Sequence, residues 1–188
     1  MYETDEASQS FLLGILSLME KYVYHGSNKE FDSEHAIPKR NIRIAEGNDG
    51  KEETIFDEES FHATPYKWIA LAYTYKSEPY EIDGKTAHYS MAVSLYEDTG
   101  EVEIFGFGSL EESLQKLYGS GGYLYHFDKD KFIYKEGLGN LEVIVQEPTK
   151  PITVERVENP VEEMQKLGVT FRFTDLGLPE NEKYRNYY

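Results

Sequence analysis

The pattern of hydrophobic and polar positions divides the chain into many short segments with strand composition and a few with helical spacing. The strand-like segments are rich in aromatic and β-branched residues and are bounded by turn residues. We expect strands over residues 22–27, 60–63, 88–96, 101–107, 123–127, 141–146, 152–157 and 169–173.

Helices are predicted where apolar residues recur every three or four positions behind a capping residue. Thr64 followed by proline predicts one helix start, and Ser109 with a glutamate three residues later predicts another. An Asn-Pro pair at residues 159–160 predicts a third. The expected helices cover residues 5–20, 65–77, 110–118 and 160–167.

Strands and helices alternate without a regular βαβ order, which predicts an α+β fold with largely antiparallel sheets. The length of 188 residues suits a single domain over residues 1–188. Residues 28–59 are polar and lack sustained periodicity apart from a brief alternation over 41–45, so we expect a long mobile loop there. The polar tail over 176–188 is expected to be flexible.

Composition narrows the classes of function. The net charge of −16 disfavours binding to nucleic acid or to anionic membrane surfaces. The absence of cysteine excludes disulfides, thiolate metal sites and cysteine nucleophiles, and it is consistent with a reducing compartment such as the cytoplasm. The acidic residues near the N-terminus are the reverse of the basic start of a secretory signal.

The segment ending in His25, Gly26 and Ser27 is the first candidate for chemistry, because an aromatic strand stops there at polar residues. The alternative is an ordinary Gly-Ser turn. The five histidines show no metal-binding spacing, and no serine-nucleophile elbow or phosphate-binding motif with a lysine is present, so no metal site is predicted.

Glu142 is the second candidate, because it follows a Gly-rich segment and opens the apolar run Val143-Ile144-Val145. A glutamate at the start of a strand is in most cases only solvated. Taken with the histidine segment and with Phe61-His62-Ala63-Thr64 before a helix, it completes an ordered set of three motifs.

In these three motifs the chain resembles the ADP-ribosyltransferase superfamily, in the branch built around a histidine, a tyrosine and a glutamate that includes diphtheria toxin and the poly(ADP-ribose) polymerases. It also resembles uncharacterised bacterial and phage proteins that share the His-Gly-Ser motif. The resemblance implies a fold of two largely antiparallel sheets that form a cleft with flanking helices. It implies NAD as substrate and an acceptor of unknown identity.

Carried over to this sequence, the resemblance implies that His25 and Ser27 contact the nicotinamide side of NAD and that the Gly26 backbone pairs with its carboxamide. Glu142 would hold the ribose and stabilise the positive charge that develops as the glycosidic bond breaks. Phe61 stands where the family has its stacking tyrosine. The missing hydroxyl would then have to come from another residue, and the candidates are Tyr66 and Tyr73.

Other functions stay open at this level. The same fold could serve as a non-catalytic binding or interaction module, since fold does not establish function. The net charge also allows an acidic inhibitor protein. An RNA phosphotransferase is disfavoured because clusters of arginine and lysine are scarce.

Overall fold

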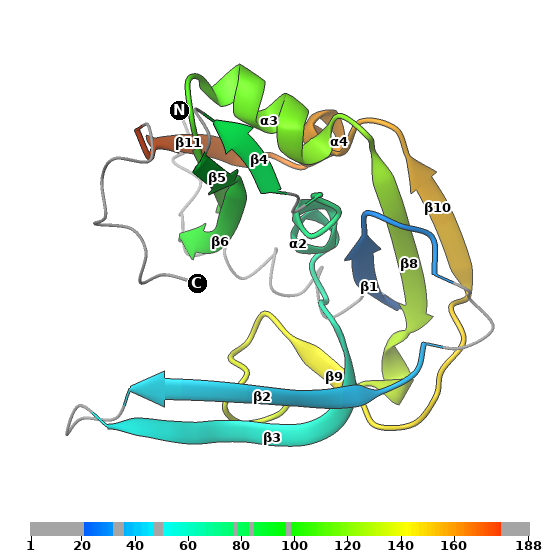
Figure 1. Ribbon diagram of the computed structural model, residues 1–188. Helices are drawn as coiled ribbons and strands as arrows, with labels where there is room; N and C mark the ends of the chain where they lie inside the picture. Colours follow the sequence, from blue (N-terminus) through cyan, green and yellow to red (C-terminus); the bar gives the residue numbers. More distant parts are fainter. Residues whose placement is uncertain are drawn as a thin grey trace, which may run out of the picture.

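The computed structural model describes residues 21–31, 36–46, 51–76, 79–82, 85–96 and 99–177. Short helices combine there with mostly antiparallel strands, so the predicted α+β class is confirmed (Figure 1). The helix predicted over 5–20 lies outside the described residues, as does the predicted tail from 178 onward. Among the described helices none has the length and apolar character needed to cross a membrane.

Short strands make up most of the ordered elements. The strands are β1 Tyr22–Ser27, β2 Lys39–Glu46, β3 Glu52–Ala63, β4 Pro79–Ile82, β5 Lys85–His88, β6 Ser90–Tyr96, β7 Thr99–Gly106, β8 Gly122–Asp128, β9 Val143–Val145, β10 Thr153–Val157 and β11 Thr170–Asp175. The helices are α2 Lys67–Ala72, α3 Leu110–Tyr118, α4 Pro160–Lys166 and the 3₁₀ turn η1 Lys129–Lys131.

The described strands form three three-stranded sheets, in the orders β1-β8-β10, β11-β7-β6 and β2-β3-β9, and a two-stranded sheet β4-β5. All pairs are antiparallel except β11 with β7. The expected count of two sheets was therefore wrong. Tyr24 of β1 forms one isolated bridge with Thr64, the residue that follows β3, and the two sheets do not merge.

The sheet β1-β8-β10 separates two hydrophobic cores, because successive side chains of a strand point to opposite faces. Leu124 of β8 packs on one face with Leu71 of α2 and Met164 of α4. Tyr125 and Phe127 pack on the other face in the core that contains β9. Figure 1 shows α2 at the centre of the molecule, with α3 and α4 above it. This arrangement fixes β1 between α2 and the end of β3.

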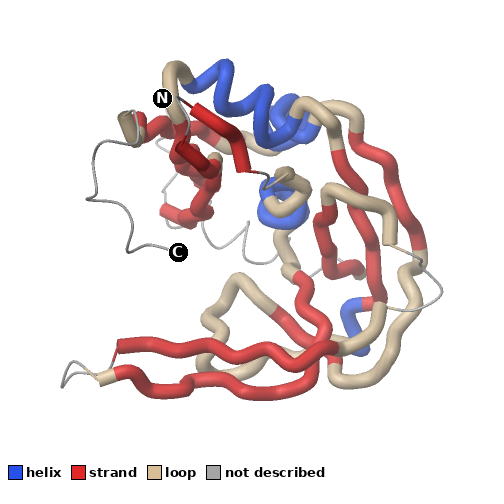
Figure 2. The backbone as a smooth tube through the Cα atoms, in the orientation of Figure 1, coloured by secondary structure: helices blue, strands red, loops and turns tan. Residues whose placement is uncertain are grey.

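The prediction of a long loop over residues 28–59 was wrong, because much of that segment forms the antiparallel pair β2 and β3. Figure 2 shows these strands as a long ribbon that projects beside the rest of the described chain. Both faces of the ribbon carry exposed side chains, so an apolar alternation is not required. Cross-strand pairs stabilise it instead, as where Arg40 donates two hydrogen bonds of 2.7 Å to Asp57.

Thr64 was expected to cap a helix, but α2 starts three residues later at Lys67 and ends at Ala72. The reason is that the N–H and C=O of Thr64 pair with Tyr24, which keeps the chain extended. The side chain of Thr64 accepts a hydrogen bond from the N–H of Tyr66 and turns the chain toward α2. By contrast, Ser109 caps α3 as predicted.

Candidate functional site

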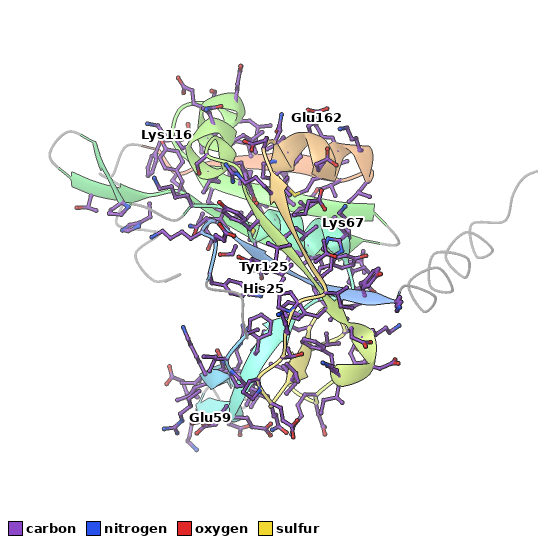
Figure 3. All side chains as sticks on the ribbon, turned by 90° about the vertical axis from the view of Figure 1, so that its right-hand side faces the viewer. His25, Glu59, Lys67, Lys116, Tyr125 and Glu162 are labelled. Atoms are coloured by element: carbon purple, nitrogen blue, oxygen red, sulfur yellow. The ribbon has the colours of Figure 1, made fainter. Side chains whose placement is uncertain are left out.

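The structure brings the three sequence motifs together. β1 carries His25, the end of β3 carries His62, and Glu142 immediately precedes β9. His62 pairs with Ile144 in the β3–β9 ladder, which sets Glu142 beside the end of β3. Figure 3 shows His25 near Tyr125 at the level where the β2–β3 ribbon joins the rest of the described chain. The sequence motifs thus converge at this junction.

His25, His62 and Glu142 form a hydrogen-bonded row, in which the ring of His25 bonds to the backbone of His62 and the ring of His62 bonds to the carboxylate of Glu142. His25 Nδ1 lies 2.9 Å from the carbonyl oxygen of His62, and His62 Nδ1 lies 2.8 Å from Glu142 Oε1. A carbonyl and an ionised carboxylate can only accept, so Nδ1 carries the proton in both rings. The Nε2 of His62 lies 2.9 Å from Ser60 Oγ and accepts from it when the ring is neutral. Both rings are therefore held in one tautomer and orientation.

Arg43 of β2 completes the environment of Glu142. Its Nη2 lies 3.0 Å from Oε1 and 3.3 Å from Oε2 of the carboxylate. Burial opposes ionisation of Glu142, but the hydrogen bond from His62 and the charge of Arg43 outweigh it and place the pKa of the carboxyl below its ordinary value. Glu142 is therefore a preplaced negative charge at neutral pH.

A first cavity of about 330 Å³ lies along this row. It joins the end of β1 to the start of α2 and to the loop before β9. Its lining residues are Tyr24, His25, Gly26, His62, Ala63, Thr64, Ile69, Ala70, Tyr73, Val93, Leu138, Leu141 and Glu142. Most of this wall is apolar, and the polar groups of His25, His62 and Glu142 converge on it, which is the usual composition of a small-molecule site.

Gly26 lines this cavity with backbone groups rather than with a side chain. A Cβ on Gly26 would lie 1.7 Å from the carbonyl oxygen of Ala70, so only glycine allows β1 to approach α2 this closely. Backbone groups alternate along a strand, and those of Tyr24 point to Thr64 rather than to β8. The N–H and C=O of Gly26 consequently face the same side, where β1 and β3 have diverged. Within the described residues no backbone group pairs with them there.

A second cavity of about 500 Å³ lies against the β2–β3 ribbon. It shares His25, His62 and Glu142 with the first cavity. Its remaining lining residues are Phe31, Ala36, Ile37, Lys39, Asn41, Arg43, Ser60 and Phe61. The hydrogen-bonded row is thus a wall common to two cavities.

The structure separates the residues proposed for NAD. His25, Gly26, Tyr73 and Glu142 line the first cavity, whereas Ser27 and Tyr66 do not. The Oγ of Ser27 donates to the carbonyl of Lys29 over 2.6 Å, which closes a local turn. Phe61 lines the second cavity and packs against the ring of His25, with centroids 4.7 Å apart. Of the two candidate tyrosines, only Tyr73 lies at the first cavity.

Three residues of this site were not predicted as site residues, namely His62 of the row and its neighbours Ser60 and Arg43. His62 appeared in a motif, but its role depends on the contact with Glu142, which is distant in sequence. One signal was present. Ser60 and His62 are two residues apart in a predicted strand, so their side chains point to the same face. No comparable local signal marks Arg43.

In the described part of the chain, no cluster of histidine and acidic residues has the arrangement of a metal site. The chain matches no protein-family model, and comparisons with curated proteins and with solved structures found no match. The functional argument therefore depends on the geometry of the row and its cavities.

Proposed function

We propose that this protein has an ADP-ribosyltransferase-like fold and transfers ADP-ribose from NAD to an acceptor. The observation that carries the proposal is the first cavity, where His25, the free edge of Gly26 and the carboxylate of Glu142 lie together. The proposal requires one substrate to contact both ends of this set. The confirmed α+β class is compatible with that fold.

Each group has a definite task in this reaction. Burial lowers the pKa of His25, so its ring is neutral at pH 7, and Nε2 is left as an acceptor because Nδ1 donates to His62. The N–H and C=O of Gly26 suit a carboxamide, which has one acceptor and one donor group. Burial and the nearby charge of Glu142 raise the pKa of Tyr73, which keeps its phenol protonated.

Glu142 supplies the electrostatic part of catalysis. Cleavage of the bond between ribose and nicotinamide develops positive charge on the sugar, and a fixed carboxylate stabilises that charge. The ion pair with Arg43 and the hydrogen bond from His62 hold the carboxylate in place and ionised. The exposed side of Arg43 leaves room for it to move when a ribose hydroxyl approaches.

Acyl transfer by Ser60 is a second candidate, favoured by the order Ser60, His62, Glu142, in which Nε2 meets the serine and Nδ1 meets the carboxylate. It ranks second for two reasons. Ser60 is only 2% exposed, which hinders attack on a substrate. The amide of Asn41, which lines the same cavity, already donates to the carbonyls of Lys39 and Ser60 and is therefore not free to act as an oxyanion donor.

Nicotinamide release from NAD tests the proposal against these rivals. Glu142→Gln keeps the shape of the side chain but removes its charge, so turnover should fall about a hundredfold or more while NAD affinity changes little. Glu136→Gln, in an exposed glutamate of the same loop, is the matched control and should retain activity. Equal turnover in wild type and Glu142→Gln, both folded and saturated with NAD, would sink the catalytic role.

Absence of turnover with measurable NAD binding would instead favour the non-catalytic binding module. An acidic inhibitor would bind no NAD at all. Covalent labelling of wild type by a fluorophosphonate, lost in Ser60→Ala, would favour acyl transfer. The three outcomes are distinct, so one set of purified variants separates the candidates.

A further inference from the structure

The second cavity has a charged floor made by one face of β2. Lys39, Asn41 and Arg43 alternate along the strand and all three line the cavity. Arg40 and Ile42 point to the opposite face, where Arg40 pairs with Asp57. The two cations therefore face the cavity as a direct result of the strand alternation.

These cations have unused hydrogen-bonding capacity. Arg43 donates to Glu142 through Nη2 alone, and within the described residues its Nε and Nη1 donate to no partner. Lys39 forms no ion pair with any described residue. Two cations and one carboxylate line the cavity, so its charge is net positive in a chain whose net charge is −16. An anionic group is the ligand chemistry that this floor suits.

The opposite wall is apolar and partly aromatic. Phe31 is fixed there because its ring stacks on Tyr125, with centroids 3.8 Å apart, and its N–H donates to the Tyr125 hydroxyl. Phe61 and the exposed Ile37 continue this wall. A volume of about 500 Å³ suits a small molecule with one flat ring.

We propose that the second cavity is the acceptor site and that it takes a small anionic acceptor with a planar ring, such as a mononucleotide. This inference rests on the proposed function. The two cavities share the wall that contains Glu142, so a ribose held at Glu142 can release nicotinamide on one side and meet an acceptor on the other.

The transfer step needs only NAD, the acceptor and the carboxylate of Glu142. An acceptor oxygen attacks C1′ of the ribose as the bond from C1′ to the nicotinamide nitrogen breaks. The electron pair of that bond stays on the nitrogen, which turns the cationic pyridinium of NAD into neutral nicotinamide. The proton of an attacking hydroxyl passes to the carboxylate of Glu142 and then to water.

Uridine 5′-monophosphate is the probe, because it carries a ring and a phosphate but lacks the adenine of NAD. Calorimetry should show that it binds at least about tenfold more tightly than uridine, since only the nucleotide meets the cations. Incubation with NAD should yield an adduct in which an ADP-ribosyl group replaces one hydrogen of the probe, as its mass will show. Lys39→Gln should lower both the affinity and the adduct yield about tenfold and leave nicotinamide release to water unchanged.

Arg40→Gln is the matched control, because it removes the same charge from the same strand on the face away from the cavity. Equal losses in the two variants would overturn the site, since they would show only long-range attraction. Competition between the probe and NAD would also overturn it, because the cavity would then hold part of NAD itself. Nicotinamide release without probe binding refutes this inference alone, whereas probe binding without nicotinamide release refutes the proposed function.

Discussion

His62 holds Glu142 by a hydrogen bond of 2.8 Å from Nδ1 to Oε1. His62 lies in β3 and Glu142 immediately precedes β9, and the bond exists because β9 pairs with the end of β3. The other ring nitrogen of His62 lies against Ser60, so the imidazole cannot turn without losing a partner. The orientation and ionisation of the carboxylate thus depend on a residue that need not contact the substrate.

Replacing His62 by alanine should change the pH dependence of turnover. The hydrogen bond from His62 lowers the pKa of Glu142, so its loss moves that pKa upward. The reaction needs the ionised carboxylate, and the acid limb of the profile should therefore shift to higher pH. Turnover at neutral pH should fall about tenfold to a hundredfold through misplacement of the carboxylate.

His62→Asn is the matching conservative variant, because its side-chain amide can donate where Nδ1 does. It should restore much of the turnover and return the acid limb toward that of wild type. Profiles of nicotinamide release over pH 4 to 8 check both variants. An unshifted acid limb in the alanine variant would contradict the positioning role.

We expect Tyr73 to stack on the nicotinamide ring in the first cavity, because Phe61 does not line that cavity. Tyr73→Ala should weaken NAD binding about tenfold or more, the scale of one lost stacking contact. Tyr66→Ala is the control, since Tyr66 lies outside that cavity. Calorimetric titration of NAD distinguishes them. If Tyr66→Ala caused the larger loss, the assignment of the first cavity to nicotinamide would fail.

His25 makes folding stability depend on pH in weakly acidic solution. Burial lowers its pKa in the folded state below the ordinary value of 6.5, whereas the unfolded chain takes up the proton near that value. The stability contribution is complete above pH 6.5 and is lost as the pH falls through the lower folded-state pKa. Denaturant unfolding from pH 7.5 to 5 should show this slope.

Two variants assign that slope to His25. His25→Gln removes one buried titrating group and should reduce the slope, while His126, whose pKa burial also lowers, supplies the remainder. His88→Gln, at an exposed histidine, should leave it unchanged. A slope of equal size in wild type and His25→Gln would mean that another group is responsible.

Gly26→Ala should destabilise the fold by about 2–3 kcal/mol, because the new methyl group meets the carbonyl of Ala70 and backbone must move. Gly139→Ala is a useful comparison. Its Cβ would enter open space, and only its positive φ of 73° is unfavourable, at about 1 kcal/mol. Equal thermal midpoints for the two variants would contradict the close packing of β1 on α2.

Local signals explain what the sequence predicts well. The helix α3 starts and ends where Ser109 and Gly119 indicate, since capping depends on neighbours within one turn. The hairpin of β2 and β3 gives only the brief alternation over residues 41–45, because its exposed faces need no sustained apolar alternation. The bridge between Tyr24 and Thr64 also overrides a local cap preference, and that contact is not visible from either residue alone.

In the candidate site, too, residues in local motifs were predicted and residues placed by long-range strand pairing were missed. His25 and Glu142 were predicted together from motifs, and the structure places both at one cavity. Ser27 and Tyr66 carried matching residue types but point elsewhere. Arg43 was missed because its position opposite Glu142 follows from the pairing of β2 with β3, and no pattern around residue 43 indicates that pairing.

The register of the β2–β3 hairpin decides which chemistry the second cavity receives. A slip of one residue would turn Arg40 and Ile42 inward and Lys39 and Arg43 outward. Asn41 opposes such a slip, because its amide donates across the strand pair to the carbonyl of Ser60 on β3, in addition to the carbonyl of Lys39 on its own strand. A side chain with no part in the reaction thereby helps to keep two cations, rather than the single Arg40, on the floor of the second cavity.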